Sequence, residues 1–277
     1  MSVVTGGAGG VGLATAQRIG RTHHVLLSDI DAARLAQAAG QLAANGIDCS
    51  THVGDVASRS AVDELVAQAV SLGPVRSVIH TAGISPAMGP AETIMRVNAI
   101  GTVNVTTAFL PVATEGFALV NVGSMAAHVT PSLLMPTRSY RYALSDIETF
   151  FARLMRRCRL VPVAQRSRLA YSISKNFVVW YSARMAGAFG DRGARIVSVS
   201  PGAIDTPMGR LEEEDSASVV RYAALKRPAR ADEIAAVLAF CASPDAGYLT
   251  GADILCDGGV VAGLRWRDVL TMARARS

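Results

Sequence analysis

Short apolar runs alternate with amphipathic stretches along most of this chain. The runs have the length and composition of strands and cover residues 3–5, 25–28, 47–53, 77–80, 118–121, 195–198 and 254–256. Stretches with the apolar spacing of helices cover residues 11–19, 32–44, 61–72, 94–109, 171–189 and 232–241. Strands that are apolar on both faces and alternate with helices are typical of a parallel sheet covered on both sides. We therefore predict one α/β domain over residues 1–277, a doubly wound parallel sheet of about seven strands with helices on both faces.

Composition disfavours several other classes of protein. No apolar run approaches the roughly 20 residues that a membrane span requires. The chain enters a glycine-rich loop within a few residues of Met1, which leaves no room for a secretory signal. The four cysteines lack C-x-x-C spacing, and the five histidines show no pattern of metal ligands. We expect a cytoplasmic protein with reduced thiols, no membrane span and no metal site.

The first apolar run leads directly into the loop Thr5-Gly6-Gly7-Ala8-Gly9-Gly10-Val11-Gly12. Glycines let a backbone turn tightly and approach a pyrophosphate, which then lies at the N-terminus of the following helix. The spacing is T-G-x-x-x-G-x-G rather than G-x-G-x-x-G. Alone, such a loop could be any tight turn between a strand and a helix. The candidate cofactor-binding residues in it are Gly6, Gly9, Gly10, Val11 and Gly12.

Asp29 ends the second apolar run, 17 residues after Gly12. A carboxylate at this position accepts hydrogen bonds from both hydroxyls of an adenosine ribose and repels a 2′-phosphate. The next residues, Ile30 and Asp31, provide no cation to bind that phosphate. Asp31 is better placed than Asp29 to cap the helix that begins at residue 32. The pattern therefore favours NAD(H) over NADP(H).

Tyr171 and Lys175 lie four residues apart, which places a phenol and an ammonium on one face of a helix. A phenol titrates near ~10, so at neutral pH it exchanges protons poorly. A neighbouring ammonium favours the phenolate and lowers its pKa toward the range of a general acid or base. Such a pair is common by chance on a solvated helix face, so its weight depends on the other motifs.

Taken together, the motifs resemble those of the short-chain dehydrogenase/reductase family, in the family's order along almost the whole chain. They are the loop 5–12, Asp55-Val56, His80-Thr81-Ala82-Gly83, Asn98, Ser124 in Asn121-Val122-Gly123-Ser124, Tyr171 with Lys175, Pro201-Gly202-Ala203-Ile204-Asp205-Thr206 and Asp257-Gly258-Gly259. Each motif alone is weak, whereas the ordered set is specific. The resemblance implies a Rossmann-type fold and an oxidoreductase.

The resemblance also implies a role for each catalytic candidate. Tyr171 would give a proton to a carbonyl, or take one from an alcohol, as the cofactor carries the hydride. Lys175 would bind the nicotinamide ribose and lower the tyrosine pKa. Ser124 would hydrogen-bond the substrate oxygen, and Asn98 would hold a water that links Lys175 to solvent.

Further cofactor contacts follow from the same resemblance. The adenine would lie beside Asp55 and Val56, although Asp55 could equally be a simple turn residue. The adenosine would lie on the backbone of Ala82 and Gly83. The residues expected around the nicotinamide are Pro201, Gly202, Ile204 and Thr206, of which the Ile204 backbone and Thr206 would orient the carboxamide.

The chain departs from the family's pattern in three places. His80 and Thr81 replace two asparagines, so the hydrogen bonds that brace the sheet must be made differently. Ser124 and Tyr171 are 47 residues apart, far more than in most members. The segment from Gly83 to Asn98 is short, at 15 residues. This combination resembles the branch of bacterial 3α-hydroxysteroid dehydrogenase/carbonyl reductase.

The long separation implies an insertion at about residues 131–168. Ser145-Asp146-Ile147-Glu148 has the pattern of a capping box, and it predicts an amphipathic helix with apolar residues on one side up to Cys158. Eight arginines lie between Arg138 and Arg168, against two carboxylates. We expect the insertion to cover the helix face on which relatives form tetramers, leaving a homodimer. The basic segment is either a solvated flap or a mouth for acidic substrates such as coenzyme A thioesters.

The leading interpretation is an NAD(H)-dependent oxidoreductase that interconverts a secondary alcohol and a ketone. Met208 and Leu211, with Met135 and Leu133 of the insertion, favour a hydrophobic substrate, for which a steroid is one candidate. A reductase of 3-oxoacyl thioesters, or a 3-hydroxyacyl dehydrogenase, is the alternative within the family. A nucleotide-sensing binding protein with little catalysis is less favoured because tyrosine and lysine are both present. Nucleic acid is not an expected partner, because the arginines are not interleaved with aromatic residues.

Overall fold

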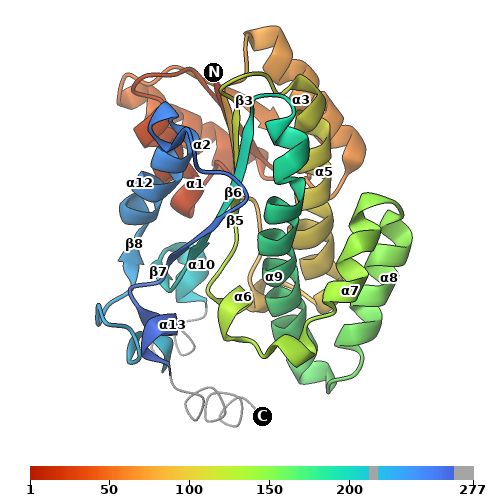
Figure 1. Cartoon of the computed structure of the whole chain (residues 1–277). Helices are drawn as coiled ribbons and strands as arrows, with labels where there is room; N and C mark the ends of the chain where they lie inside the picture. The colour runs from red at the N-terminus through yellow and green to blue at the C-terminus, as the bar shows by residue number, and fades with distance from the viewer. Residues whose placement is uncertain (212–217, 265–277) are drawn as a thin grey trace.

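The computed structural model of the chain describes residues 1–211 and 218–264, and a seven-stranded sheet lies at its centre (Figure 1). The strands are β1 (Ser2–Thr5), β2 (Val25–Asp29), β3 (Cys49–Val53), β4 (Ser77–His80), β5 (Ala118–Val122), β6 (Arg195–Pro201) and β9 (Asp253–Cys256). Their order is β3-β2-β1-β4-β5-β6-β9, and every pairing is parallel. The predicted doubly wound sheet and all seven predicted strands are confirmed.

Helices cover both faces of this sheet (Figure 1). One face carries α1 (Gly10–Ile19), α2 (Ala32–Ala44) and α12 (Ala231–Ala242). The other face carries α3 (Arg59–Leu72), α4 (Ala91–Ile94), the π-helical turn η2 (Met95–Ile100), α5 (Gly101–Phe109) and α9 (Val163–Gly190). The predicted helix over 94–109 is thus the later part of a helical run that begins at Ala91 and contains a π turn.

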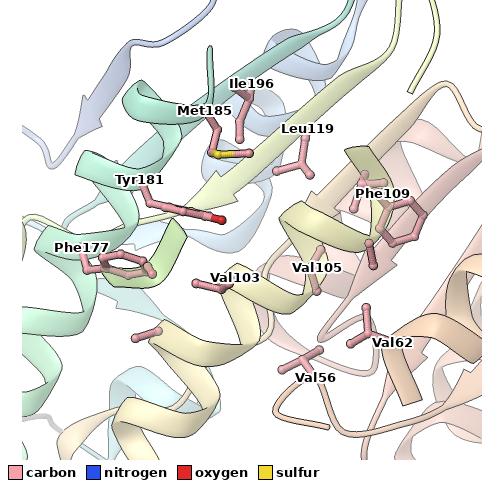
Figure 2. Packing of buried hydrophobic residues seen from close by; sticks show 14 of the residues in the cluster. Val56, Val62, Val103, Val105, Phe109, Leu119, Phe177, Tyr181, Met185 and Ile196 are labelled. Atoms are coloured by element: carbon pink, nitrogen blue, oxygen red, sulfur yellow. The ribbon is translucent and has the colours of Figure 1, made fainter. Parts of the chain in front are cut away.

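Successive strand residues point into two separate cores. Val3 and Leu119 are buried on the α5–α9 face, whereas their neighbours Val4 and Val120 are buried on the α1–α12 face. Figure 2 shows the first core, where Phe109 of α5 and Tyr181 of α9 are among the side chains near the strands. Burying one such side chain contributes about 1.5–3 kcal/mol, so the apolar strands fix the layered arrangement.

Residues between β5 and α9 form a set of short helices beside the lower half of α9 (Figure 1). They are α6 (Ala126–Val129), η4 (Ser132–Leu134), α7 (Thr137–Tyr140), η5 (Arg141–Leu144) and α8 (Ile147–Cys158). The predicted amphipathic helix is α8, and its Phe150, Leu154 and Cys158 are fully buried. The Phe150 ring lies 4.6 Å from the Phe177 ring of α9, centroid to centroid. Helix α8 also contacts α4 and η2, the helical run that carries Asn98.

Two details of this region differ from the prediction. The N-cap of α8 is Asp146 and not Ser145, because the Asp146 carboxylate accepts a hydrogen bond from Thr149 N at 2.9 Å. Helix α9 begins at Val163, eight residues before Tyr171, so the last part of the predicted insertion is helix continuous with Tyr171. Met135 is buried, with its Sδ 3.9 Å from the Tyr140 hydroxyl oxygen, so it is not free to line a pocket.

The remaining elements are short. They are η1 (Pro86–Met88), η3 (Leu110–Val112), β7 (Ile204–Asp205), α10 (Pro207–Arg210), β8 (Ala229–Arg230), η6 (Pro244–Ala246) and α13 (Val260–Gly263). The parallel β7–β8 pair was not predicted. The acidic run 212–215 and the apolar tail residues after 264 lie outside the described residues. Among the described helices, none has the length and hydropathy to cross a membrane.

Candidate active site

The loops at the carboxyl ends of the strands meet where the strand order reverses, between β1 and β4. In open α/β sheets this is where ligands bind. The glycine loop after β1 packs directly on the segment after β4, because a Cβ on Gly6 would lie 2.8 Å from the Ala82 Cα. Gly6 also has φ +66°, a conformation that favours glycine. Both observations explain why this position carries no side chain.

The same loop faces the segment that follows β6. A Cβ on Gly10 would lie 3.6 Å from Thr206 Cγ2, so the two segments are neighbours. Gly9 is the N-cap of α1, and no side chain caps this helix. The first backbone N–H groups of α1 therefore have no side-chain acceptor, and a helix end of this kind suits a phosphate. The lack of side chains and the uncapped helix together fit the pyrophosphate of a dinucleotide, with Val11 in the first turn.

The carboxylate of Asp29 lies against the glycine loop. Its Oδ2 accepts a hydrogen bond from Ala8 N at 3.2 Å, and its Oδ1 accepts one from Asp31 N at 3.3 Å. Asp31 in turn caps α2 by accepting from Ala33 N and Arg34 N, as predicted. Asp29 is thus placed where a ribose beside the loop would lie, while the Ile30 side chain is exposed.

The segment after β3 lies at the same edge of the sheet. Asp55 Oδ1 accepts a hydrogen bond from Ala57 N at 2.8 Å, so this aspartate forms a local turn. Val56 is buried beside Gly101 of α5, and its carbonyl accepts a hydrogen bond from Asn104 Nδ2 at 3.0 Å. Sequence reasoning missed Asn104, because a single polar residue inside a helix carries no pattern.

Asn98 lies in the π turn η2 and links the loop after β4 to α9. Its Oδ1 accepts a hydrogen bond from Ile84 N at 2.9 Å, and its Nδ2 donates to Ile84 O at 3.0 Å. The same amide lies 3.3 Å from Ser174 Oγ on α9. π turns inside helices are frequent at functional sites. Ser174, which was not predicted, therefore helps to hold the loop after β4 against α9.

Lys175 is the most buried cation of the site, at 7% exposure. Its Nζ donates a hydrogen bond to Val122 O at 2.9 Å and lies 5.8 Å from the centre of the Tyr171 ring. A Cβ on Gly83 would lie 3.4 Å from this Nζ and 3.2 Å from Asn98 Oδ1. Burial lowers the Lys175 pKa to about 8. The ammonium, the phenol ring and Asn98 are thus neighbours.

His80 and Thr81, which stand in place of two asparagines, both brace the sheet through Thr5. The Thr81 hydroxyl donates to Thr5 O at 2.7 Å, and His80 Nδ1 lies 2.7 Å from Thr5 Oγ1. Burial, with a smaller contribution from the Lys175 charge, lowers the His80 pKa to about 3. The imidazole is therefore neutral, and both side chains link β4 to β1.

Ser124 lies at the end of β5, two residues beyond the carbonyl that Lys175 contacts. It is 9% exposed, and its Oγ accepts a hydrogen bond from Ala126 N at 3.2 Å. Asn176, one residue after Lys175, donates to Ala127 O at 3.0 Å and accepts from the Tyr140 hydroxyl at 3.0 Å. This unpredicted bridge ties the loop that carries Ser124 to α9 and to the insertion.

The segment 201–206 closes the other side of the site. Pro201 O accepts a hydrogen bond from Met125 N at 2.8 Å, beside Ser124. A Cβ on Gly202 would lie 2.8 Å from the Asp257 Cα, so the two glycine-containing motifs pack together. Ile204 is in the β7–β8 pair, and the Thr206 hydroxyl caps α10 by accepting from Gly209 N at 3.1 Å. The segments that follow β1, β4, β5 and β6 thus lie together at the carboxyl edge of the sheet.

Among the described residues, no group of three or more histidine, cysteine, aspartate or glutamate side chains could hold a metal ion.

Two family models match the chain. The short chain dehydrogenase model matches residues 1–136, and the enoyl-(acyl carrier protein) reductase model matches residues 159–261. A short-chain dehydrogenase/reductase of Alternaria brassicicola is 32% identical, over 92% of this chain and 94% of that protein. A 3-alpha-hydroxysteroid dehydrogenase/carbonyl reductase of Comamonas testosteroni is 32% identical, over 68% of this chain and 73% of its own length.

Solved structures share the fold at lower identity. A short chain dehydrogenase from Burkholderia cenocepacia in complex with NADP has a TM-score of 0.74 at 22% identity, covering 94% of this chain and 96% of that one. A 3-oxoacyl-[acyl-carrier protein] reductase from Brucella melitensis with bound NAD has a TM-score of 0.72 at 21% identity, covering 93% and 89%.

Proposed function

The chain belongs to the short-chain dehydrogenase/reductase family, and we propose that it uses NAD(H) to interconvert a secondary alcohol and a ketone. Family membership makes it an NAD(P)-dependent oxidoreductase that acts on CH–OH or carbonyl groups. The observation that carries the proposal is the buried Lys175 ammonium, which lies one helical turn from Tyr171 and binds the end of β5 that leads to Ser124.

The bound dinucleotide would supply or accept the hydride, and this chain's own residues would manage the proton. Tyr171 would hydrogen-bond the substrate oxygen and give or take its proton. Lys175, charged below a pKa of about 8, would stabilise the phenolate that results. Ser124 would donate to the same oxygen and stabilise charge that develops there. Asn98 would keep the loop after β4 in place and hold a water beside Lys175.

The preference for NAD(H) follows from Asp29. Its carboxylate would bind the ribose hydroxyls of the cofactor, since it is already held against the glycine loop by Ala8 N. A 2′-phosphate at that point would meet a like charge. The other proposed cofactor contacts are Gly6, Gly9, Gly10, Val11, Gly12, Ile30, Asp55, Val56, Ala82, Gly83, Pro201, Gly202, Ile204 and Thr206.

A hydrophobic substrate is the preferred class. Met208 and Leu211, just after Thr206, are exposed apolar side chains. The Comamonas relative, whose name gives a hydroxysteroid as substrate, supports the same choice. A thioester substrate is the second candidate. It is favoured by three exposed arginines of the insertion, Arg138, Arg156 and Arg159, for which the described residues provide no ion-pair partner.

The test is a panel of steroid, aliphatic and thioester substrates, assayed with NAD⁺ and NADP⁺ separately. With the best substrate, Tyr171→Phe should lower kcat about a hundred- to ten-thousandfold, the range that general acid–base catalysis contributes. Tyr248→Phe, at a fully exposed phenol, is the matched control and should leave kcat unchanged. Undiminished turnover by folded Tyr171→Phe would contradict the proposed mechanism, and turnover of thioesters alone would favour the second candidate.

We further propose one domain over residues 1–277 with an insertion at about 131–168, assembled as a homodimer. The family models leave residues 137–158 unmatched, which supports the insertion. Packing of α8 on α9, α4 and η2 supports the smaller assembly, because that face is no longer open to another subunit. Light scattering should give the mass of two chains, and a tetramer would contradict the inference.

A further inference from the structure

Arg34 occupies an unfavourable position for a cation. It is the third residue of α2, and the first turn of a helix repels positive charge by about 0.3–1 kcal/mol. The side chain is exposed, and within residues 1–211 and 218–264 no ion pair or hydrogen bond holds its guanidinium. Its location therefore gives α2 no evident stability.

The guanidinium lies on the glycine loop. A Cβ on Gly9 would collide with Arg34 Nη2, and among the described residues other than its chain neighbours only Arg34 has atoms within 4 Å of that Cβ. Gly9 has φ −171°, an extended conformation that any residue adopts. The backbone therefore does not require glycine at this position. The missing side chain leaves space that the Arg34 guanidinium occupies.

Arg34 and Asp29 thus flank the same two residues of the loop. Asp29 Oδ2 accepts a hydrogen bond from Ala8 N, and the Arg34 guanidinium lies against Gly9, the next residue. A carboxylate and a guanidinium beside one loop suit two different ligand groups. The carboxylate suits ribose hydroxyls, whereas the planar guanidinium suits a phosphate monoester.

We propose that Arg34 is a second determinant of cofactor specificity, which pairs with the 2′-phosphate of NADP(H) across the glycine loop and lets this protein accept NADP(H) despite Asp29. The inference rests on the proposed function and deepens it. NAD(H) remains the preferred cofactor, and the discrimination between the two depends on ionic strength, because salt screens an exposed cation.

Binding of NADH and NADPH, followed by nicotinamide fluorescence without substrate, tests this assignment. Arg34→Ala should weaken NADPH binding about tenfold or more, the contribution of a hydrogen bond between charged groups, and NADH binding less than about threefold. The wild-type affinity for NADPH should fall with added salt more steeply than that of the variant. Arg21→Ala, at another exposed arginine near the far end of α1, should change neither affinity.

Arg34→Lys provides a second variant, because it keeps the positive charge and removes the planar fork of the guanidinium. Its loss of NADPH binding should be smaller than that of Arg34→Ala, and its NADH binding should be unchanged. Equal losses for both cofactors in Arg34→Ala, or unchanged NADPH binding, would overturn the role of Arg34 while the proposed function stands. A wild-type protein that binds neither dinucleotide would overturn both.

Discussion

Replacing Lys175 by methionine should stabilise the fold near neutral pH while it removes activity. Lys175 is 7% exposed, and burial lowers its pKa from the ordinary 10.5 to about 8. That difference corresponds to about 3 kcal/mol, at about 1.36 kcal/mol for each pKa unit. Methionine fills a similar volume without a charge. Loss of the hydrogen bond to Val122 O offsets part of the gain, at about 1–2 kcal/mol. The net stabilisation expected at pH 7 is therefore about 1–2 kcal/mol.

The sign of the pH dependence distinguishes removal of the buried charge of Lys175 from a simple change in packing. Below pH 8 the lysine is protonated in both states, so the cost of burying the ammonium is fully present. Between about pH 8 and 10.5 the unfolded chain keeps the proton and the folded chain does not, so the stability of the wild type rises with pH. The advantage of Lys175→Met should consequently shrink over this interval.

Urea unfolding of both proteins at pH 7 and pH 9.5, followed by circular dichroism, measures the two differences. A stability difference that stays constant between these pH values would refute the reasoning. A variant that is less stable at pH 7 would show that the hydrogen bond to the end of β5 outweighs the buried charge. Turnover with the best substrate should be lost in either case, because no ammonium remains beside Tyr171.

Three further predictions concern stability. His80 is neutral in the folded protein, with a pKa of about 3. The free energy of unfolding of the wild type should therefore fall by at most about 5 kcal/mol as the pH falls from 6.5 toward 3. Acid titration of His80→Asn should show a smaller fall. Asp146→Ala removes the cap of α8 and should cost about 1 kcal/mol in urea unfolding, whereas Ser145→Ala should cost almost nothing; the reverse order would make Ser145 the cap. Phe150→Ala should cost about 3–5 kcal/mol, because this fully buried ring packs on Phe177, and a loss below 1 kcal/mol would mean that α8 is only loosely attached.

The five central strands β1, β2, β4, β5 and β6 were predictable because each is a short run buried on both faces, whereas the edge strands β3 and β9 are only partly buried. The two-residue strands β7 and β8 were not predictable, since pairs such as Ala229–Arg230 have no periodicity. The start of α9 was missed because Arg166 and Arg168 interrupt the apolar pattern before Tyr171. In the insertion, two adjacent residues were both suitable caps, and only the geometry of the turn selects Asp146 over Ser145.

Site residues that belong to a sequence motif were predictable, whereas residues whose role depends on tertiary packing were not. Tyr171, Lys175, Asn98 and the glycine loop were found by spacing and order. The bridges made by Asn176 and Ser174 were missed, because a polar residue on a helix reveals its partner only in the folded chain. The guanidinium on Gly9 was missed for the same reason, since Arg34 is close to the loop in space but is separated from it in sequence.

One consequence follows from the length of α9. Its 28 residues span about 42 Å without a break, and the same helix contacts the insertion and carries Tyr171. Adding one residue between Val163 and Tyr171 would rotate everything upstream by about 100° around the helix axis. An insertion of seven residues would restore the orientation to within about 20° but would move the upstream part about 10 Å along the helix axis. Either change would take α8 off Phe177, even though no residue of the candidate site had changed.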